Sequence, residues 1–196
     1  MPTSAEFELR TLKNEAEVKE IWEISQSIYG DVNVEFNKVV SWWKCYPNAV
    51  YVLFQDATIV GYLSMWPVKQ QTFRDIIAGK RRERELSVQS ILGKRSQKPR
   101  AYWYITNIVI RSNFRKTEAI KVLLREAMRR WVIEANLNAS INVCALAFSK
   151  QGEALLKRFG FSKYKDAEET QDKLPVYLYT ASLEDLDRIA SRLDGR

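Results

Sequence analysis

The clearest chemical signal in the sequence lies between Tyr102 and Trp131, where an apolar run is followed by a short polar turn and an amphipathic segment. The run ends at Ile110, the turn covers 111–116, and apolar residues then recur at helical spacing. A buried strand that leads through a turn into a helix presents free backbone N–H groups and the positive end of the helix dipole, which suit a phosphate or another anion. The same order of elements serves any strand–helix unit of an α/β core, so this pattern alone leaves both interpretations open.

Side-chain chemistry is restricted by the lack of histidine. Without imidazole, Ser-His-Asp and Cys-His catalysis and the common histidine-rich zinc sites are excluded. Cys45 and Cys144 are too few and too far apart for a disulfide framework or a metal knuckle, so we expect free thiols and no metal. Catalysis would have to use carboxylates, tyrosines, lysines, a thiol, backbone groups or the substrate itself.

The elements that would position this stretch follow from apolar periodicity and from capping residues. No internal repeat, flexible linker or break in composition divides the chain, so we expect one α/β domain over 1–196, with a basic linker at about 80–100. The expected elements are a strand at 7–12, helices at 14–29, 35–43 and 70–79, a strand pair at 49–54 and 58–66, the central strand at 102–110 with its helix, a strand at 140–147, a helix at 149–160, a strand at 173–180 and a helix at 183–193.

The basic cluster at Lys80–Arg84 has two interpretations. A solvated surface is the favoured one, because runs of charge usually face water. The alternative is an arm that contacts nucleic acid, although no aromatic residue interleaves the charges as a stacking platform would need.

The central stretch resembles the acyl-CoA-binding segment of the GNAT superfamily of N-acyltransferases, whose usual form is L-x-V-x-P-x-x-R-G-x-G-x-G-x-x-L-L. The apolar positions and the arginine agree without a gap, whereas the three glycines and the proline are replaced. The residues at the motif positions are Ile108, Ile110, Ser112, Arg115, Lys116, Glu118, Ile120, Leu123 and Leu124. A later segment resembles the GNAT pattern N-x-x-A-x-x-L-Y-x-x-x-G-F and has Ser149, Gly152, Leu155, Leu156, Gly160 and Phe161 at matching spacing.

The resemblance implies a GNAT-like α/β (α+β) fold, a single domain with a mixed, mostly antiparallel sheet flanked by helices. It implies an enzyme that moves an acetyl or other acyl group from coenzyme A to an amine by direct attack. In such enzymes the strand backbone pairs with the pantetheine arm and the turn amides hold the pyrophosphate. By position, the implied acetyl-CoA (acyl-CoA) contacts are Ile108, Val109, Ile110, Arg115, Lys116, Thr117, Glu118, Ala119, Ile120 and Ser149.

Glu118 is the least expected of these replacements. A carboxylate beside a pyrophosphate repels it unless the side chain turns to solvent or pairs with Arg115. Acidic residues are also common in the first turn of a helix, so Glu118 has a purely structural explanation as well.

The resemblance points to catalytic positions that this chain fills differently. The tyrosine that often reprotonates the thiolate is replaced by Leu156, and Tyr104 and Tyr164 are substitutes by residue type, with core packing as the alternative for each. The general base is often a carboxylate on the central strand, but Tyr102–Ile110 contains none. Glu35, in the second helix, is the substitute base, with exposed surface charge as its alternative.

Charge and composition limit the partners. A net charge of +7 and a pI near 9.4 favour an anionic partner, which coenzyme A, a nucleic acid and an acidic protein would all provide. No apolar run reaches membrane-spanning length and the N-terminus lacks a signal-peptide pattern, so we expect a cytoplasmic protein without membrane contact. The alternative function is a catalytically inactive GNAT-like module that recognises an acidic partner or nucleic acid through the basic linker. The acceptor amine and the oligomeric state stay open.

Overall fold

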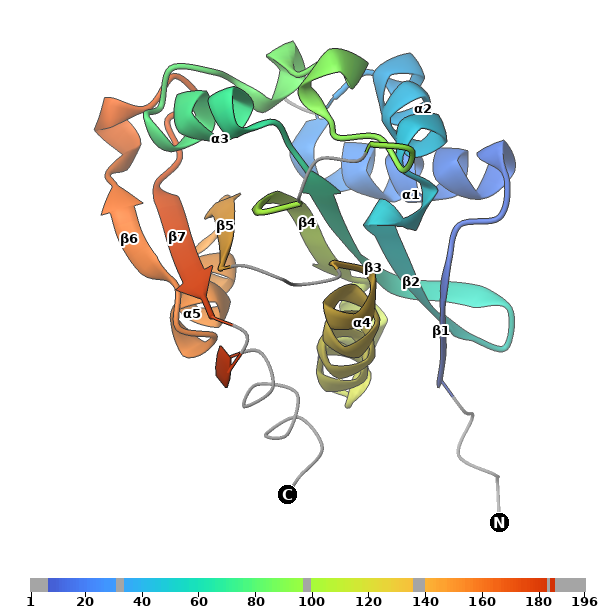
Figure 1. Cartoon of the computed structure of the whole chain (residues 1–196). Helices are drawn as coiled ribbons and strands as arrows, with labels where there is room; N and C mark the ends of the chain where they lie inside the picture. Colours follow the sequence, from blue (N-terminus) through green and yellow to red (C-terminus); the bar gives the residue numbers. More distant parts are fainter. Residues whose placement is uncertain (1–6, 31–33, 97–99, 136–139, 183, 186–196) are drawn as a thin grey trace.

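The computed structural model describes residues 7–30, 34–96, 100–135, 140–182 and 184–185. Its centre is a seven-stranded sheet with the order β1-β2-β3-β4-β5-β7-β6 (Figure 1). Neighbours β4 and β5 are parallel and the other neighbouring pairs are antiparallel, so the sheet is mixed and mostly antiparallel, as predicted. The strands are β1 (Phe7–Thr11), β2 (Val50–Gln55), β3 (Thr58–Pro67), β4 (Tyr102–Ile110), β5 (Ile141–Leu146), β6 (Ser162–Lys165) and β7 (Val176–Ala181).

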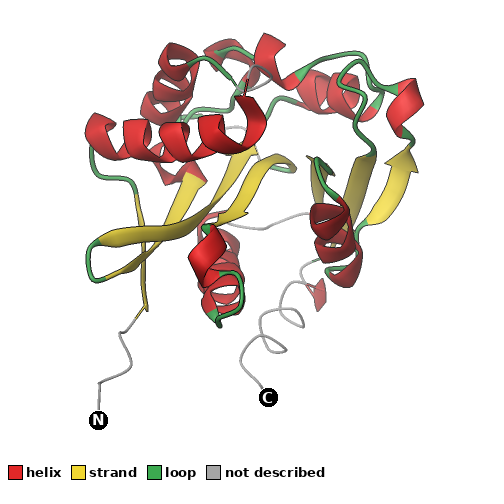
Figure 2. Cartoon of the chain, turned by 180° about the vertical axis from the view of Figure 1, so that it is seen from behind, coloured by secondary structure: helices red, strands yellow, loops and turns green. Residues whose placement is uncertain are grey.

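Helices cover both faces of the sheet (Figures 1 and 2). Three of them lie on one face and two on the other, so both faces of the central strands carry a layer of helices. This explains why the sequences of β2 and β3 are nearly continuous apolar runs rather than alternating apolar and polar residues. The first face carries α1 (Glu15–Tyr29), α2 (Phe36–Cys45) and α3 (Gln70–Ile77), and the opposite face carries α4 (Ala119–Ala135) and α5 (Lys150–Arg158).

Helix ends follow the capping residues of the sequence. The side chains of Asn14 and Ser149 each accept a hydrogen bond from a backbone N–H three residues later, at 3.0 and 3.1 Å. Gly30 and Gly160 follow the same two helices with φ of 57° and 85°, a left-handed conformation that glycine adopts at little cost. The predicted starts and ends of α1 and α5 are therefore confirmed.

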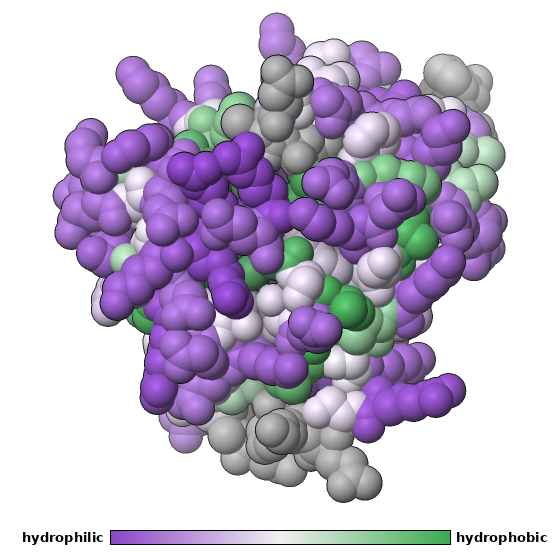
Figure 3. Space-filling model, turned by 90° about the horizontal axis from the view of Figure 1, so that it is seen from above, coloured by the Kyte–Doolittle hydropathy of each residue, from purple (hydrophilic) through white to green (hydrophobic). Residues whose placement is uncertain are grey.

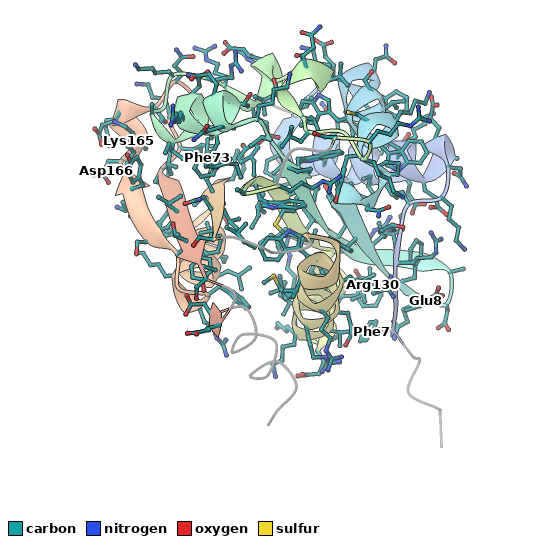
Figure 4. The ribbon with its side chains drawn as sticks, in the orientation of Figure 1. Phe7, Glu8, Phe73, Arg130, Lys165 and Asp166 are labelled. Carbon is teal, nitrogen blue, oxygen red and sulfur yellow. The ribbon has the colours of Figure 1, made fainter. Side chains whose placement is uncertain are left out.

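Aromatic side chains join the helices to the sheet. Phe73 of α3 lies with its ring 5.2 Å from that of Tyr102 at the start of β4 (Figure 4). On the opposite face, Trp131 of α4 meets Trp103 edge-on at 5.5 Å between ring centroids. The first pair is tilted and the second is edge-to-face, and aromatic contacts add to the gain from burial, which anchors both layers to β4.

Three sequence predictions need comment. The second helix begins after Glu35 and continues to Cys45, two residues beyond the predicted end. Strand β6 was not predicted, because its four residues (SKYK) are mostly exposed, pair with β7 at the edge of the sheet and carry no apolar pattern (Figure 4). The helix expected at 183–193 lies outside the described residues, apart from the capping contact in which Ser182 Oγ donates to Asp185 Oδ2 at 2.8 Å.

The state of the cysteines and the character of the helices also bear on the sequence predictions. Both cysteines are free thiols, and Cys144 is buried within β5. In the described part of the chain, no helix combines the length and apolar character that a membrane span requires.

Candidate active site

The two central parallel strands separate from each other part-way along their length. Pairing of β4 with β5 covers Tyr102–Ile105 opposite Asn142–Ala145, whereas β4 itself continues to Ile110. The carboxyl ends of the two strands therefore diverge. A crevice at the carboxyl ends of parallel strands is the usual place for a ligand in an α/β fold.

A bulge in β4 controls which side chains face each side of this crevice. Met65 of β3 pairs with Ile105, but the preceding residue, Ser64, pairs with Asn107, which leaves Thr106 as an extra residue. Ile105 and Ile108 consequently face α4 and α5. Thr106 and Asn107 face α1 and α2, where Thr106 Oγ1 accepts a hydrogen bond from the indole of Trp66 at 3.2 Å.

A cavity of about 200 Å³ occupies the opening between the strands. Its walls differ in character: the part nearer α1 and α3 is polar, and the part nearer α4 and α5 is apolar. The face of the molecule that carries α1 to α3 is mostly hydrophilic, with apolar residues showing between the hydrophilic ones (Figure 3). The polar wall includes Tyr29, Glu83, Arg84, Asp172 and Asn107, and the apolar wall includes Ile105, Ile108, Leu146, Leu155 and Leu156.

Glu83 is the residue in this cavity whose protonation is most altered. Burial raises the pKa of its carboxyl from 4.5 to about 7, and the nearby charge of Asp172 acts in the same direction. A hydrogen bond from the Tyr104 hydroxyl, at 2.5 Å to Oε2, partly opposes this rise in the pKa. A carboxyl with a pKa near 7 changes its protonation at neutral pH, which is the property required of a general base.

Tyr104 is held by the same contacts. Its ring is buried in β4, and burial together with the charge of Glu83 raises the pKa of its phenol well above the usual value. The hydroxyl therefore stays protonated and acts as a hydrogen-bond donor to Glu83 at any physiological pH.

Long-range backbone contacts place Glu83 beside β4. The turn Glu83–Glu85 follows α3, and the backbone N–H of Glu83 donates to Asp172 Oδ2 at 3.0 Å. Gly79 anchors the start of this segment: its φ is 70°, and a side chain there would approach the carbonyl oxygen of Glu169 to 2.7 Å. The Gly79 carbonyl in turn accepts a hydrogen bond from the backbone of Gln171 at 3.1 Å. The connections before β4 and before β7 thus hold each other over the cavity.

The comparisons with known proteins agree with this geometry. No family model matches the chain, and no curated protein matches its sequence. Solved structures do match. The loading GNATL domain of CurA from Lyngbya majuscula has a TM-score of 0.62 at 11% identity, covering 93% of this chain and 99% of that domain. Ard1 from Thermoplasma volcanium has a TM-score of 0.59 at 12% identity, covering 89% and 96%. The chain has the GNAT fold.

A third match is the structure of an acetyltransferase with its ligands bound. Diaminobutyrate acetyltransferase EctA from Paenibacillus lautus, in complex with its substrate and coenzyme A, has a TM-score of 0.56 at 12% identity. The match covers 89% of this chain and 95% of EctA. At identities this low, the structural similarity shows a shared GNAT fold but not a shared activity, which depends on the residues of this chain.

The turn after β4 lacks the three glycines of the GNAT motif but has unpaired backbone amides in the described part of the chain. The backbone N–H groups of Lys116, Glu118 and Ile120 have no hydrogen-bond acceptor in the described part of the chain, and these are the three former glycine positions. Between them, Thr117 Oγ1 accepts from the N–H of Ala119 at 3.2 Å. The turn therefore still offers the donors that an anion needs.

The charged side chains of this turn point away from those amides. Glu118 pairs with Lys121 at 3.0 Å, and both side chains are about two-thirds exposed, at 69% and 67%. Arg115 instead folds back, and its Nε donates to the carbonyl of Ile110 at 3.2 Å. Of the two arrangements considered for Glu118, the structure has the solvent-facing one rather than a pair with Arg115.

The remaining implied cofactor positions lie along the same wall. Ile108 and Ser149 line the cavity, and Ser149 also caps α5. Val109 and Ile110 are buried in β4, beyond the part of the strand that pairs with β5. Their contribution would therefore come from the backbone rather than from the side chains. Two of these positions therefore line the cavity, and the others lead from it along the chain to the turn after β4.

The three predicted catalytic residues lie in different places. Tyr104 contacts Glu83 of the cavity wall, as described above. Tyr164 lies on the edge strand β6, is 53% exposed and does not line the cavity between β4 and β5. Glu35 precedes α2, its side chain is 75% exposed, and it lies 3.5 Å from Lys38 outside the cavity lining. The structure therefore brings Tyr104 to the site but not Tyr164 or Glu35.

Sequence reasoning missed Glu83, and the reason is its position. It lies inside the basic cluster Lys80–Arg84, for which a solvated surface was the favoured interpretation. That interpretation fits Lys80 and Arg84, which are both exposed, although Arg84 also lines the cavity. It is wrong for Glu83, which is partly buried in the cavity wall. The available signals were a single acid among bases and the glycine four residues before it, Gly79.

Proposed function

We propose that the protein is an N-acyltransferase that moves an acyl group from coenzyme A to an amine in a ternary complex. The observation that carries the proposal is Glu83, a carboxyl with a pKa near 7 at the opening between β4 and β5. An amine arrives at neutral pH as its ammonium form and must lose a proton before it can attack a thioester. A base at the site of attack supplies that step.

In the proposed mechanism Glu83 takes one proton from the ammonium and frees the nitrogen lone pair. The nitrogen then attacks the thioester carbon, the C–N bond forms, and the C–S bond breaks. The second proton of the nitrogen is gained by the departing thiolate, so the products are an amide, a thiol and a protonated Glu83 that returns its proton to water. Tyr104 acts as a positioning residue, because its hydroxyl fixes the Glu83 carboxylate by a 2.5 Å hydrogen bond.

The path from the turn to the cavity supports binding of the acyl-CoA. The amides of Lys116, Glu118 and Ile120 would hold the pyrophosphate, and the unpaired edge of β4 near Ile108 would pair with the pantetheine arm. Because backbone groups make these contacts, the contacts tolerate the replacement of the three glycines of the motif by other residues. The net charge of +7 favours the same anionic co-substrate.

The test combines a binding and a rate measurement. Acetyl-CoA is titrated into the protein by calorimetry, and release of free thiol is then followed with a panel of primary amines. We expect saturable binding and amine-dependent thiol release that rises with pH through about 7, following ionisation of Glu83. If neither binding nor thiol release is found, and salt-sensitive binding to nucleic acid is found instead, the inactive binding module replaces this proposal.

A further inference from the structure

A second cavity adjoins the first. It has a volume of about 50 Å³ and is enclosed by α4, α5 and the face of the sheet that they cover. Its far end is formed by Met128 and Trp131 of α4 and by Phe159 and Phe161 after α5. Its lining is almost entirely hydrocarbon, in contrast to the polar wall around Glu83.

The two cavities share a wall. Ile105 and Ile108 of β4 and Leu155 and Leu156 of α5 line both of them. Leu156 stands where the GNAT resemblance places a tyrosine, and it is buried, at 5% exposure. Leucine offers no hydroxyl and no ring at this boundary, so the shared wall is aliphatic. An acyl chain that extended from the first cavity into the second would pass between these groups.

We propose that the second cavity receives the acyl chain of the thioester, and that the preferred acyl group is a short linear hydrocarbon chain rather than acetyl. This inference rests on the proposed acyl transfer. The carbonyl would lie between the two walls, with the amine on the side of Glu83 and the hydrocarbon on the side of Leu156. The opposite polarity of the two walls then matches the opposite polarity of the two groups that meet at the carbonyl carbon.

The lining favours an acyl chain over the pantetheine arm. Pantetheine carries two amides, and burying an amide without hydrogen-bond partners is costly. The first cavity offers partners such as Asn107, Ser149 and the unpaired edge of β4, whereas the second offers almost none. A hydrocarbon chain needs no partners and gains from the transfer out of water.

The size of the cavity sets the chain length. A volume of roughly 10–15 Å³ on this measure holds one water-sized group, so about 50 Å³ holds about four methylene-sized groups. Adding the carbonyl carbon and one carbon at the boundary gives a chain of about six carbons. Acetyl would leave the cavity empty, and a chain much longer than six carbons would meet Met128 and Trp131.

The experiment measures kcat/KM for acetyl-, butyryl-, hexanoyl- and decanoyl-CoA with a saturating amine from the acceptor panel. We expect hexanoyl-CoA to exceed acetyl-CoA by at least about tenfold, because each methylene that leaves water for an apolar pocket favours binding. Decanoyl-CoA should fall below hexanoyl-CoA. Equal or better use of acetyl-CoA would overturn the inference while leaving the proposed acyl transfer intact.

Substitutions at Met128 link the preference to this cavity. Met128→Phe fills its far end and should lower the hexanoyl-to-acetyl ratio about tenfold, and Met128→Ala enlarges it and should move the optimum towards decanoyl-CoA. Met128→Leu, which conserves volume, is the control. If Met128→Phe does not fold, Met128→Ala still tests the proposal. An unchanged hexanoyl-to-acetyl ratio in both Met128→Phe and Met128→Ala would overturn the proposal. If none of the four thioesters reacts or binds, the proposal and the proposed function are both overturned.

Discussion

The two walls of the central cavity are built in opposite ways. On the side of α1 to α3, Glu83 and Asp172 come from connections 89 residues apart and are fixed by hydrogen bonds. On the side of α4 and α5, Ile105 and Leu156 come from a strand and a helix of the central fold and are fixed by apolar packing. Loops often place polar groups next to a reacting atom, whereas packed helices and strands determine the shape of a pocket. We infer that the polar wall determines the reaction and the apolar wall determines which acyl group fits.

The largest expected effect comes from Glu83→Gln on the polar wall. The amide keeps the shape of the side chain but cannot accept the ammonium proton, so we expect kcat to fall by about 10²- to 10⁴-fold. The measurement is thiol release at saturating acyl-CoA and amine. Glu168→Gln, an exposed acid on the neighbouring connection, is the control. A variant that keeps both the rate and the rise with pH would remove Glu83 from the mechanism.

The same substitution separates a catalytic role from a structural one through pH. Because the folded-state pKa of Glu83 is raised from 4.5 to about 7, the folded state binds its proton more tightly than the unfolded chain. Its contribution to the free energy of unfolding is therefore full below pH 4.5 and is lost as the pH rises through 7. We expect urea denaturation to show Glu83→Gln more stable than the parent chain at pH 8, with the difference vanishing at pH 4. A less stable variant at pH 8 would contradict the raised pKa.

The apolar wall is tested by putting a hydroxyl and a ring into it. Leu156→Tyr should block the passage to the second cavity and cost about 1–3 kcal/mol of stability through overpacking. We expect the rate with hexanoyl-CoA to fall more than the rate with acetyl-CoA. A general loss of folded protein would instead lower both rates equally. Leu156→Met, close to the same volume, should cost less than about 1.5 kcal/mol and leave the chain-length preference in place. An equal fall for both thioesters in Leu156→Tyr would argue against a passage at this residue.

The two walls also differ in how far the sequence predicts them. The apolar wall and its elements were predictable, because the limits of β4, the cap at Ser149 and the glycine after α5 are local signals. Leu156 itself was identified from the spacing of a motif. Local patterns are enough when each element can be recognised without its neighbours.

The polar wall was not predictable in the same way. Glu83 differs from the other acids of the chain only by its environment, and that environment is created by contacts with residues far along the sequence. Desolvation, which raises the pKa, is a property of the folded surroundings rather than of the residue. For the same reason Glu35 and Tyr164 were reasonable candidates by type but lie in exposed positions.

A smaller effect is expected from Tyr104→Phe, which tests how the two parts of the polar wall cooperate. The hydrogen bond from Tyr104 lowers the pKa of Glu83, so its removal should raise that pKa further. At pH 7 a smaller fraction of Glu83 would be ionised, and we expect roughly a tenfold lower rate, about the value of one hydrogen bond. The pH–rate profile should shift to higher pH and recover at alkaline pH. A lower rate with an unshifted profile would mean that Tyr104 supports packing rather than the base.

The smallest expected effect concerns Glu118, at the outer end of the path to the cavity. Its carboxylate is exposed and paired with Lys121, so its repulsion of a pyrophosphate is weakened but not abolished. Replacing it by glutamine should raise the affinity for coenzyme A about two- to fivefold at low salt, and screening at 0.5 M salt should remove the gain. Calorimetry measures both. Glu23→Gln is a matched control, since Glu23 is also exposed and pairs with a lysine, Lys19, on a helix. If the Glu118 variant binds no more tightly than this control at low salt, the pyrophosphate does not lie at the turn, and the free amides there have another use.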